Sequence, residues 1–211
     1  WGYETDGLLT EEDFESNYPV IASDARPGDI KYVDRNEDGI INSDDRKVMG
    51  STIPRWEYGS NVEVGWKNFN LNLQLQGVGK RDISLWGAYI EAGSWEGFTI
   101  DKVAGNYWTE DNPNARFPRP QKQTQKNTHP SEWWVIDGSY LRLKNVQLTY
   151  SLPVRIIGKA GMRAASIFVG GTNLLTFSKL NDWGVDAEAP PGRADYYPPV
   201  KTYTVGVNIN F

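Results

Sequence analysis

Oxygen-bearing side chains recur at regular intervals in the segment 34–45. Counted from its first residue, they stand at positions one, three, five, nine and twelve, with a glycine at position six and an apolar residue at position eight. This is the spacing of a twelve-residue calcium loop, in which alternate side chains turn inward and the glycine permits a sharp bend. The segment therefore predicts a Ca²⁺ site. Its ligands would be Asp34, Asn36, Asp38, the Ile40 carbonyl, Asn42 and Asp45.

The last position of this loop departs from the EF-hand pattern. Asp45 stands where an EF-hand has Glu, and its arm is one methylene shorter, as in dockerin-type loops. The competing interpretation is an acidic Asx turn that holds no metal. No long amphipathic helices flank the segment, so we expect a structural ion rather than a signalling one.

Residues for covalent or acid–base catalysis are scarce in the chain. It has one histidine, His129, and no cysteine, so these residue types cannot form a nucleophile pair or a second metal cluster. His129 lies in the polar stretch 121–130, where we expect a solvated loop histidine. The sequence therefore predicts a protein that is not an enzyme.

Aromatic residues gather between the strongest strand patterns, in segments expected to be loops. They could stack on sugars or line a peptide groove, or they could pack large loops onto one another; we favour packing, because large loops need a core of their own. The candidate substrate contacts are Trp86, Trp95, Trp133 and Trp134.

The final ten residues alternate polar and apolar side chains without a break, which predicts a strand with two unlike faces. The apolar set is Tyr203, Val205, Val207, Ile209 and Phe211. Such a strand suits a membrane barrel, with lipid on one side and a wet lumen on the other. A terminal strand of a soluble β-sandwich has the same period.

The segment 56–77 repeats this alternation in two runs. If Lys67 and Asn68 form a two-residue turn, Trp66 and Phe69 pair directly and must share a face. That face carries Trp56, Tyr58, Val62, Val64, Trp66, Phe69, Leu71, Leu73 and Leu75. The opposite face carries Glu57, Asn61, Glu63, Asn70, Asn72, Gln74 and Gln76. So many amides are too costly for a packed interior, and so apolar an opposite face suits lipid rather than water.

Three further strands complete the pattern, at 140–152, 163–172 and 201–211, each near the roughly 9–11 residues of a tilted barrel strand. Leu141 and Leu143 fall out of phase with Val146 and Leu148, which predicts a β-bulge or an upper part that leaves the membrane. The predicted fold class is all-β, an antiparallel transmembrane β-barrel segment with long extracellular loops. Residues 1–55 would form an extracellular loop region that contains the calcium loop, and residues 56–211 would supply the five strands.

Composition is compatible with this fold and excludes other classes. The formal net charge is −5 and the pI is about 5.0, which argues against a nucleic-acid partner. No stretch approaches the roughly 18 apolar residues of a membrane helix. The sequence shows no initiator Met and no signal peptide, so we expect a piece that starts within a longer exported protein.

The lengths of the connections predict an orientation. Barrels keep short turns on the periplasmic side and long loops outside. The short connections are 67–68 and 153–162, and the long ones are 78–139 and 173–200. Phe211 would therefore lie at the periplasmic rim, and everything before Trp56 would lie outside the cell. The competing class is a secreted, calcium-stabilised β-sandwich such as a glycan-binding module, whose apolar face would pack on a second sheet of the same chain.

Several short runs, in order, resemble the C-terminal part of SusC/RagA-type TonB-dependent outer-membrane transporters of Bacteroidetes. They are PGDIKYVD at 27–34, DDR at 44–46 with Gly50, QGVG at 76–79, SYLRLKNV at 139–146, GTNLLT at 171–176 and YP at 197–198. Each run alone is weak, but together they extend over nearly the whole chain.

This resemblance implies a role in nutrient uptake at the cell outer membrane. Such transporters form a 22-stranded barrel with an N-terminal plug, and a SusD-like surface lipoprotein closes over the extracellular mouth. Oligosaccharides or oligopeptides are imported with energy relayed by TonB, which acts through an N-terminal region absent from this sequence. The chain would supply the last five strands. Its partners would be the rest of the barrel and plug, the lipoprotein, outer-membrane lipid and the glycan or peptide cargo.

Overall fold

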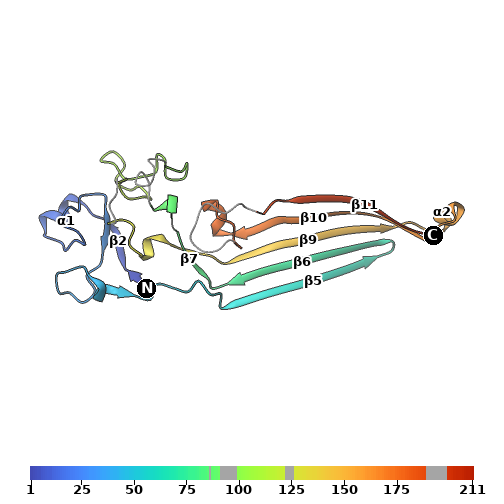
Figure 1. The fold of residues 1–211 in the computed structure, drawn as a ribbon, viewed down its shortest axis with the longest axis horizontal. Helices are drawn as coiled ribbons and strands as arrows, with labels where there is room; N and C mark the ends of the chain where they lie inside the picture. Colours follow the sequence, from blue (N-terminus) through green and yellow to red (C-terminus); the bar gives the residue numbers. More distant parts are fainter. Residues whose placement is uncertain (86, 91–98, 122–125, 189–198) are drawn as a thin grey trace.

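A computed structural model describes residues 1–85, 87–90, 99–121, 126–188 and 199–211. Figure 1 shows an elongated molecule in which a long, gently twisted sheet extends from a cluster of loops and short elements. The amino terminus lies among the loops, and the carboxyl terminus lies at the far end of the sheet.

The sheet has five antiparallel strands, as the alternation of side chains predicts. They are β5 (Trp56–Trp66), β6 (Phe69–Gly79), β9 (Tyr140–Ser151), β10 (Ala164–Ser178) and β11 (Thr202–Asn210). Their order across the sheet is β11-β10-β9-β6-β5, so every strand pairs with its neighbour in sequence within the sheet. Such a meander needs only hairpin connections.

The hairpin between β5 and β6 has the predicted register. Trp66 pairs with Phe69, and Lys67 in the turn adopts a left-handed backbone with φ of 54°. The rings of Trp66 and Phe69 stack at 6.4 Å between centroids, and the Phe69 ring lies 4.7 Å from that of Tyr150 on β9. Aromatic side chains of β5, β6 and β9 thus lie together at one end of the sheet.

The predicted bulge lies in β9. Gln74 pairs with Asn145 and Leu75 pairs with Leu143, so Lys144 is the extra residue. The inserted residue places Leu141 and Leu143 on the same face as Val146 and Leu148, which follow the bulge, because one added residue shifts the side-chain phase by one.

β10 is longer than predicted. The predicted strand stops at Thr172, but after an irregularity between Thr172 and Leu175 pairing with β9 resumes and continues to Ser178. Asn173 takes a left-handed φ of 53° at this point. A β-bulge accommodates a residue of this conformation without ending the strand. The glycines at 170 and 171 interrupt the strand pattern in the sequence, so the part of β10 that follows them was not predicted.

The other elements are short and belong mainly to the loop cluster. Three two-stranded sheets pair β1 (Gly2–Tyr3) with β4 (Arg46–Lys47), β2 (Thr5–Leu8) with β3 (Ile30–Tyr32), and β7 (Asp82–Ser84) with β8 (Val135–Asp137). The helical turns are α1 (Glu11–Glu15), η1 (Ser43–Asp45), η2 (Gly87–Tyr89), η3 (Glu132–Trp134), α2 (Val154–Ile157), η4 (Gly158–Ala160) and η5 (Lys179–Trp183). No helix among the described residues is long and apolar enough to cross a membrane.

The hydrophobic core lies in the loop cluster and at its junction with the sheet. It joins residues far apart in sequence, among them Tyr3, Ile30, Ile83, Phe117 and Trp134. Residues 1–55 therefore share one core with the connections that follow β6 and β10. Along β5, in contrast, every residue is exposed.

Candidate functional site

The sheet presents two chemically opposite faces that continue across all five strands. One row of directly paired residues is Val64, Leu71, Leu148, Val169 and Val205. The adjacent row is Glu63, Asn72, Gln147, Gly170 and Thr204. Because successive side chains point to opposite faces, the first row belongs to an apolar face and the second to a polar one.

The apolar face is open. Val64, Val169 and Val205 all have well-exposed side chains, and no described segment of the chain packs a second sheet on it. An exposed apolar surface of this extent marks a contact with lipid or protein. We call the opposite side, which carries Glu63 and Gln74, the polar face.

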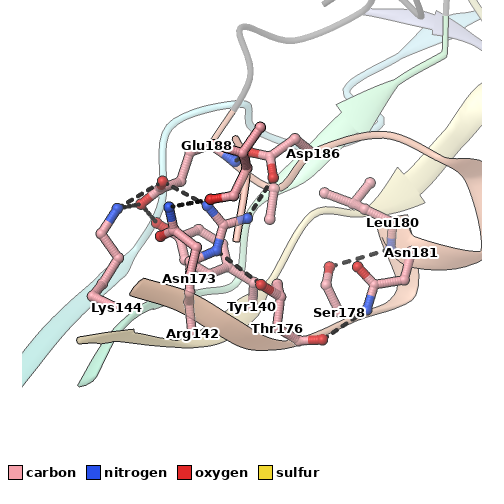
Figure 2. Close-up of polar contacts among 12 residues, drawn as sticks. Tyr140, Arg142, Lys144, Asn173, Thr176, Ser178, Leu180, Asn181, Asp186 and Glu188 are labelled. Carbon is pink, nitrogen blue, oxygen red and sulfur yellow. Dashed lines mark hydrogen bonds and ion pairs between the residues drawn. The ribbon is translucent and has the colours of Figure 1, made fainter. Parts of the chain in front are cut away.

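A buried ion network stands on the polar face where the sheet meets the loops. Figure 2 shows Arg142 of β9 at its centre. The guanidinium is 2 % exposed and donates from Nε to Thr176 Oγ1 at 2.9 Å, from Nη1 to Glu188 Oε2 at 2.7 Å, and from Nη2 to Asp186 Oδ2. Each of the three guanidinium nitrogens thus donates a hydrogen bond, as a buried charge requires.

Lys144 and Tyr140 extend the network along β9. Lys144 Nζ donates to both carboxylate oxygens of Glu188, at 3.0 and 2.9 Å. The Tyr140 hydroxyl lies 3.4 Å from the same carboxylate. Two cations thus face Asp186 and Glu188, so the cluster is close to electrically balanced.

The network fastens the segment 179–188 over the end of the sheet. Leu180 and Ala187 are buried in the core, Asn181 Nδ2 donates to the Thr176 carbonyl at 2.7 Å, and Arg81 Nη1 donates to the Ala187 carbonyl at 2.9 Å. The segment therefore joins β9, β10 and the connection that follows β6, at the level where the sheet gives way to loops.

An open cavity of about 600 Å³ lies beside this network. Its lining includes Glu57, Gln76, Arg81, Tyr140 and Glu188. Arg81 Nε is buried and has no hydrogen-bond partner among the described residues. The cavity thus offers carboxylate, amide, hydroxyl and guanidinium groups, which can hydrogen-bond to a polar oligomer.

Tyr140, Arg142 and Lys144 lie in the family-like run 139–146, but the sequence predicts no ion network for them. Arg142 stands between two leucines of a strand, and Asp186 and Glu188 lie in a distant irregular segment, so no local spacing links these residues. One signal was present: a cation at a position that alternates with apolar residues must face away from lipid.

The segment 34–45 folds into a tight loop built on its own side chains. Asp34 Oδ2 accepts from the Gly39 backbone N–H at 2.7 Å, Asn36 Oδ1 from that of Asp38 at 3.2 Å, and Asp38 Oδ1 from that of Ile40 at 2.9 Å. Gly39 has the left-handed φ of 82° that the bend requires.

Asp45 closes the loop from within. It is fully buried and accepts from the backbone N–H groups of Arg35 and Asn42, both at 2.8 Å. Burial opposes ionisation of Asp45, but these backbone donors outweigh it and hold the pKa of the carboxyl below its usual value. The ionised Asp45 carboxylate thus stabilises the loop by accepting hydrogen bonds from its backbone.

The side chains predicted to bind Ca²⁺ differ in their hydrogen-bond partners. Asn36 Nδ2 donates to Asp38 Oδ2 at 2.9 Å, and Asn42 caps η1 by accepting from the Asp44 N–H. Asp34 Oδ1 is buried without a hydrogen-bond partner in the described part of the chain. Within those residues, no group of three or more His, Cys, Asp or Glu side chains takes a metal-holding arrangement.

Of the aromatic candidates for substrate contact, Trp133 and Trp134 fall in η3. Trp134 is buried in the loop core beside Phe117 and donates from Nε1 to the Asn127 carbonyl at 2.8 Å. Trp133 packs against the same core, with the Arg116 guanidinium over its ring at 5.0 Å. These placements favour packing over stacking on a substrate. Trp86 and Trp95 lie outside the described residues.

Comparisons with known proteins agree on one family, although no family model matches the chain. "TonB-dependent receptor P3" of Formosa agariphila is 33% identical over the whole chain, which spans 22% of that relative. "TonB-dependent receptor P26" of the same organism is 33% identical over 87% of the chain, which spans 20% of it. The chain thus corresponds to about a fifth of the length of each relative.

Solved structures match over the whole chain as well. The RagAB peptide importer in its open-open state gives a TM-score of 0.73 at 24% identity, and the chain covers 22% of the matched chain. The closed-closed state of the same importer gives 0.70 at 23% identity, with the same coverage. At this identity the likeness shows the fold, which is that of a barrel segment.

These relatives are named as receptors and importers rather than enzymes, in line with the scarcity of catalytic residues in the sequence. TonB-dependent receptors are outer-membrane proteins, and the apolar face fits that environment. Over its whole length the chain is thus similar to a segment of TonB-dependent receptors, and its fold is similar to that of a segment of the RagAB importer.

Proposed function

We propose that the chain forms part of the barrel wall of an outer-membrane importer. The single observation that supports this most is the pair of opposite faces, continuous over five strands, with the apolar face open. In a barrel wall the apolar face contacts lipid and the polar face lines an aqueous lumen. Both edges of the sheet, β5 and β11, have one side with which no other described strand pairs. Because unpaired amides are costly in hydrocarbon, the remaining strands of a 22-stranded barrel would pair with them.

The soluble β-sandwich is not favoured. It requires the apolar face to be packed on a second sheet of the same chain, and the described strands outside the five-stranded sheet form only short two-stranded pairs within the loop cluster. The core also lies with the loops rather than against the apolar face.

The faces can be tested by cysteine labelling in the full-length receptor within outer-membrane preparations, because this chain contributes no cysteine of its own. Gln74→Cys on the polar face should react with a water-soluble maleimide. The adjacent Leu73→Cys should react at least about tenfold more slowly, because thiolates form poorly in hydrocarbon. Equal labelling of the two positions would contradict the assignment of the faces.

The proposed cargo is an oligosaccharide or an oligopeptide, taken up with a SusD-like surface lipoprotein and with energy from TonB. The resemblance to SusC/RagA transporters supports this, as does the polar cavity of about 600 Å³ beside Arg142. The loop cluster would then face the cell exterior and the lipoprotein. A strain that lacks the receptor gene should lose growth on one cargo class, and complementation with the intact gene should restore it. Unchanged growth on both classes would contradict the proposal.

We further propose that the segment 34–45 binds Ca²⁺ as a structural ion of the loop cluster. The spacing of its oxygen side chains supports this, as does the buried Asp34 Oδ1, which has no hydrogen-bond partner among the described residues. Asp45 is committed to backbone N–H groups in this structure, so its part as a ligand requires at least one of those hydrogen bonds to be shared or replaced.

Calcium binding can be measured by calorimetry on the full-length receptor after chelation. Wild type should bind at this segment, and Asp34→Ala with Asp38→Ala should abolish that binding while the barrel stays folded. Asp44→Ala is the matched control, because Asp44 lies in the same loop but outside the predicted ligand set. Equal binding by wild type and the double variant would refute the site.

A further inference from the structure

The end of the sheet remote from the loops is strongly basic. We call it the turn end and define it as residues 65–70, 150–164 and 207–211. It contains Lys67, Arg155, Lys159 and Arg163 and no aspartate or glutamate. All four side chains belong to exposed residues, and none forms an ion pair with another described residue. Figure 1 shows the turn between β5 and β6 and the helix α2 at this same end.

The basic residues lie next to apolar side chains that project into the surroundings. Val154 and Ile156 of α2 are 75 % and 60 % exposed, while Ile157 in the same turn is buried and anchors it. Trp66 and Phe69 stand at the adjacent end of the apolar face, and the Lys67 ammonium lies 4.6 Å from the centre of the Trp66 ring. Aromatic rings and snorkelling cations are typical of the boundary between hydrocarbon and headgroups.

A hollow of about 310 Å³ lies between α2 and the ends of β10 and β11. Leu152, Val154, Ala165 and Ile209 line it, and Arg163 lies among them. Ala165 and Ile209 pair directly and belong to the apolar face. The hollow thus joins an apolar wall to a cationic group, which matches a molecule with an acyl part and an anionic head.

We propose that the turn end binds anionic phospholipids of the membrane leaflet it faces. Arg155, Lys159, Arg163 and Lys67 contact the phosphate-bearing headgroups, and the hollow beside α2 receives the glycerol and upper acyl region of one lipid. Charge complementarity selects this occupant, because a cluster of exposed basic side chains beside exposed apolar side chains is attracted to an anionic lipid surface. This inference rests on the proposed role of the sheet in a barrel wall, whose short turns face the periplasmic leaflet.

The test uses the full-length receptor in nanodiscs that contain equal amounts of phosphatidylglycerol and phosphatidylcholine with identical acyl chains. Native mass spectrometry after release into detergent counts the lipids that remain bound. Wild type should retain phosphatidylglycerol in preference to phosphatidylcholine. Arg155→Gln with Lys159→Gln should reduce that preference about tenfold, since each cation near an anionic surface contributes a several-fold factor in binding.

The matched control is Lys179→Gln with Lys201→Gln, which removes the same charge at the loop end of the sheet and should leave the preference unchanged. Thermal unfolding of each variant in the same nanodiscs shows whether it is folded. A folded wild type that retains both lipids equally, or a control that loses the preference as fully as the double variant, would overturn the proposal. A receptor that does not enter nanodiscs at all would instead refute the barrel-wall function.

Discussion

Asp29 and Gly28, in the family-like run 27–34, make contacts that hold the loop cluster together. Asp29 of the run 27–34 is 1 % exposed; it accepts from Asn127 Nδ2 at 3.1 Å and from the Arg26 N–H at 3.0 Å, and lies within ion-pair range of Arg119 and Lys126. Gly28 has a φ of 86°, and the Trp108 ring occupies the space where a side chain would begin. The run therefore contacts the loop cluster through Arg119, Lys126 and Asn127.

His129 differs from the solvated loop residue that the sequence predicts. It is partly buried, and its ring makes edge contacts with Tyr3 and Tyr32 at 5.8 and 6.1 Å between centroids. Burial, with a smaller contribution from the positive charge of Arg46, lowers the pKa of His129 from its usual value of 6.5. A polar local sequence cannot reveal this, because the two tyrosines come from distant segments.

The His129 environment predicts a pH dependence. With a folded pKa below 6.5, the unfolded chain binds more protons as the pH falls through that value. The stability contributed by neutral His129 should therefore be complete above about pH 6.5 and decline below it. Hydrogen exchange of residues 1–33 in the full-length receptor, measured from pH 7.5 to 5.5 with rates corrected for intrinsic exchange, should show increasing local opening. His129→Phe should remove most of this trend; an unchanged trend in that variant would contradict the prediction.

At the scale of elements, the strands were predictable and the loops were not. Alternation of side chains is a local signal, so β5, β6, β9 and β11 could be derived from sequence alone. The phase change in β9 predicted either a bulge or a departure from the membrane, and only the structure places a bulge at Lys144. The loop cluster depends on contacts between distant residues, such as the hydrogen bond of 2.6 Å from the Tyr32 hydroxyl to the Lys126 carbonyl. No local pattern specifies such pairs, and the Arg142 network was missed for the same reason.

The Arg142 network predicts how the segment 179–188 is held. Arg142→Met would leave the Asp186 and Glu188 carboxylates without their main partner, and breaking a buried ion pair in this way costs about 3–5 kcal/mol. The segment should then open more often and be cleaved faster in limited proteolysis of the full-length receptor. Lys179→Met is the control, because Lys179 is exposed and lies 3.7 Å from Asp137, a pair worth about 1 kcal/mol at most. Equal cleavage of both variants would contradict the role of the network.

At the scale of the whole molecule, the two ends of the sheet have different tasks. The loop end contains the hydrophobic core, the ion network and the polar cavity. The turn end contains basic and apolar side chains without acidic ones. Between them lies a span whose apolar side no described segment covers, so lipid would complete the structure there rather than a second layer of this chain.

The span between the two ends gives the most direct test of the membrane assignment. Leu73→Arg places a charge on the apolar face near the middle of β6 and should destabilise the inserted barrel by roughly 2–4 kcal/mol. Gln74→Arg, one residue further on the polar face, should cost little because its side chain enters water. Urea-driven folding of the full-length receptor into vesicles measures both changes. Equal destabilisation by the two substitutions would show that the faces do not meet lipid and water as proposed.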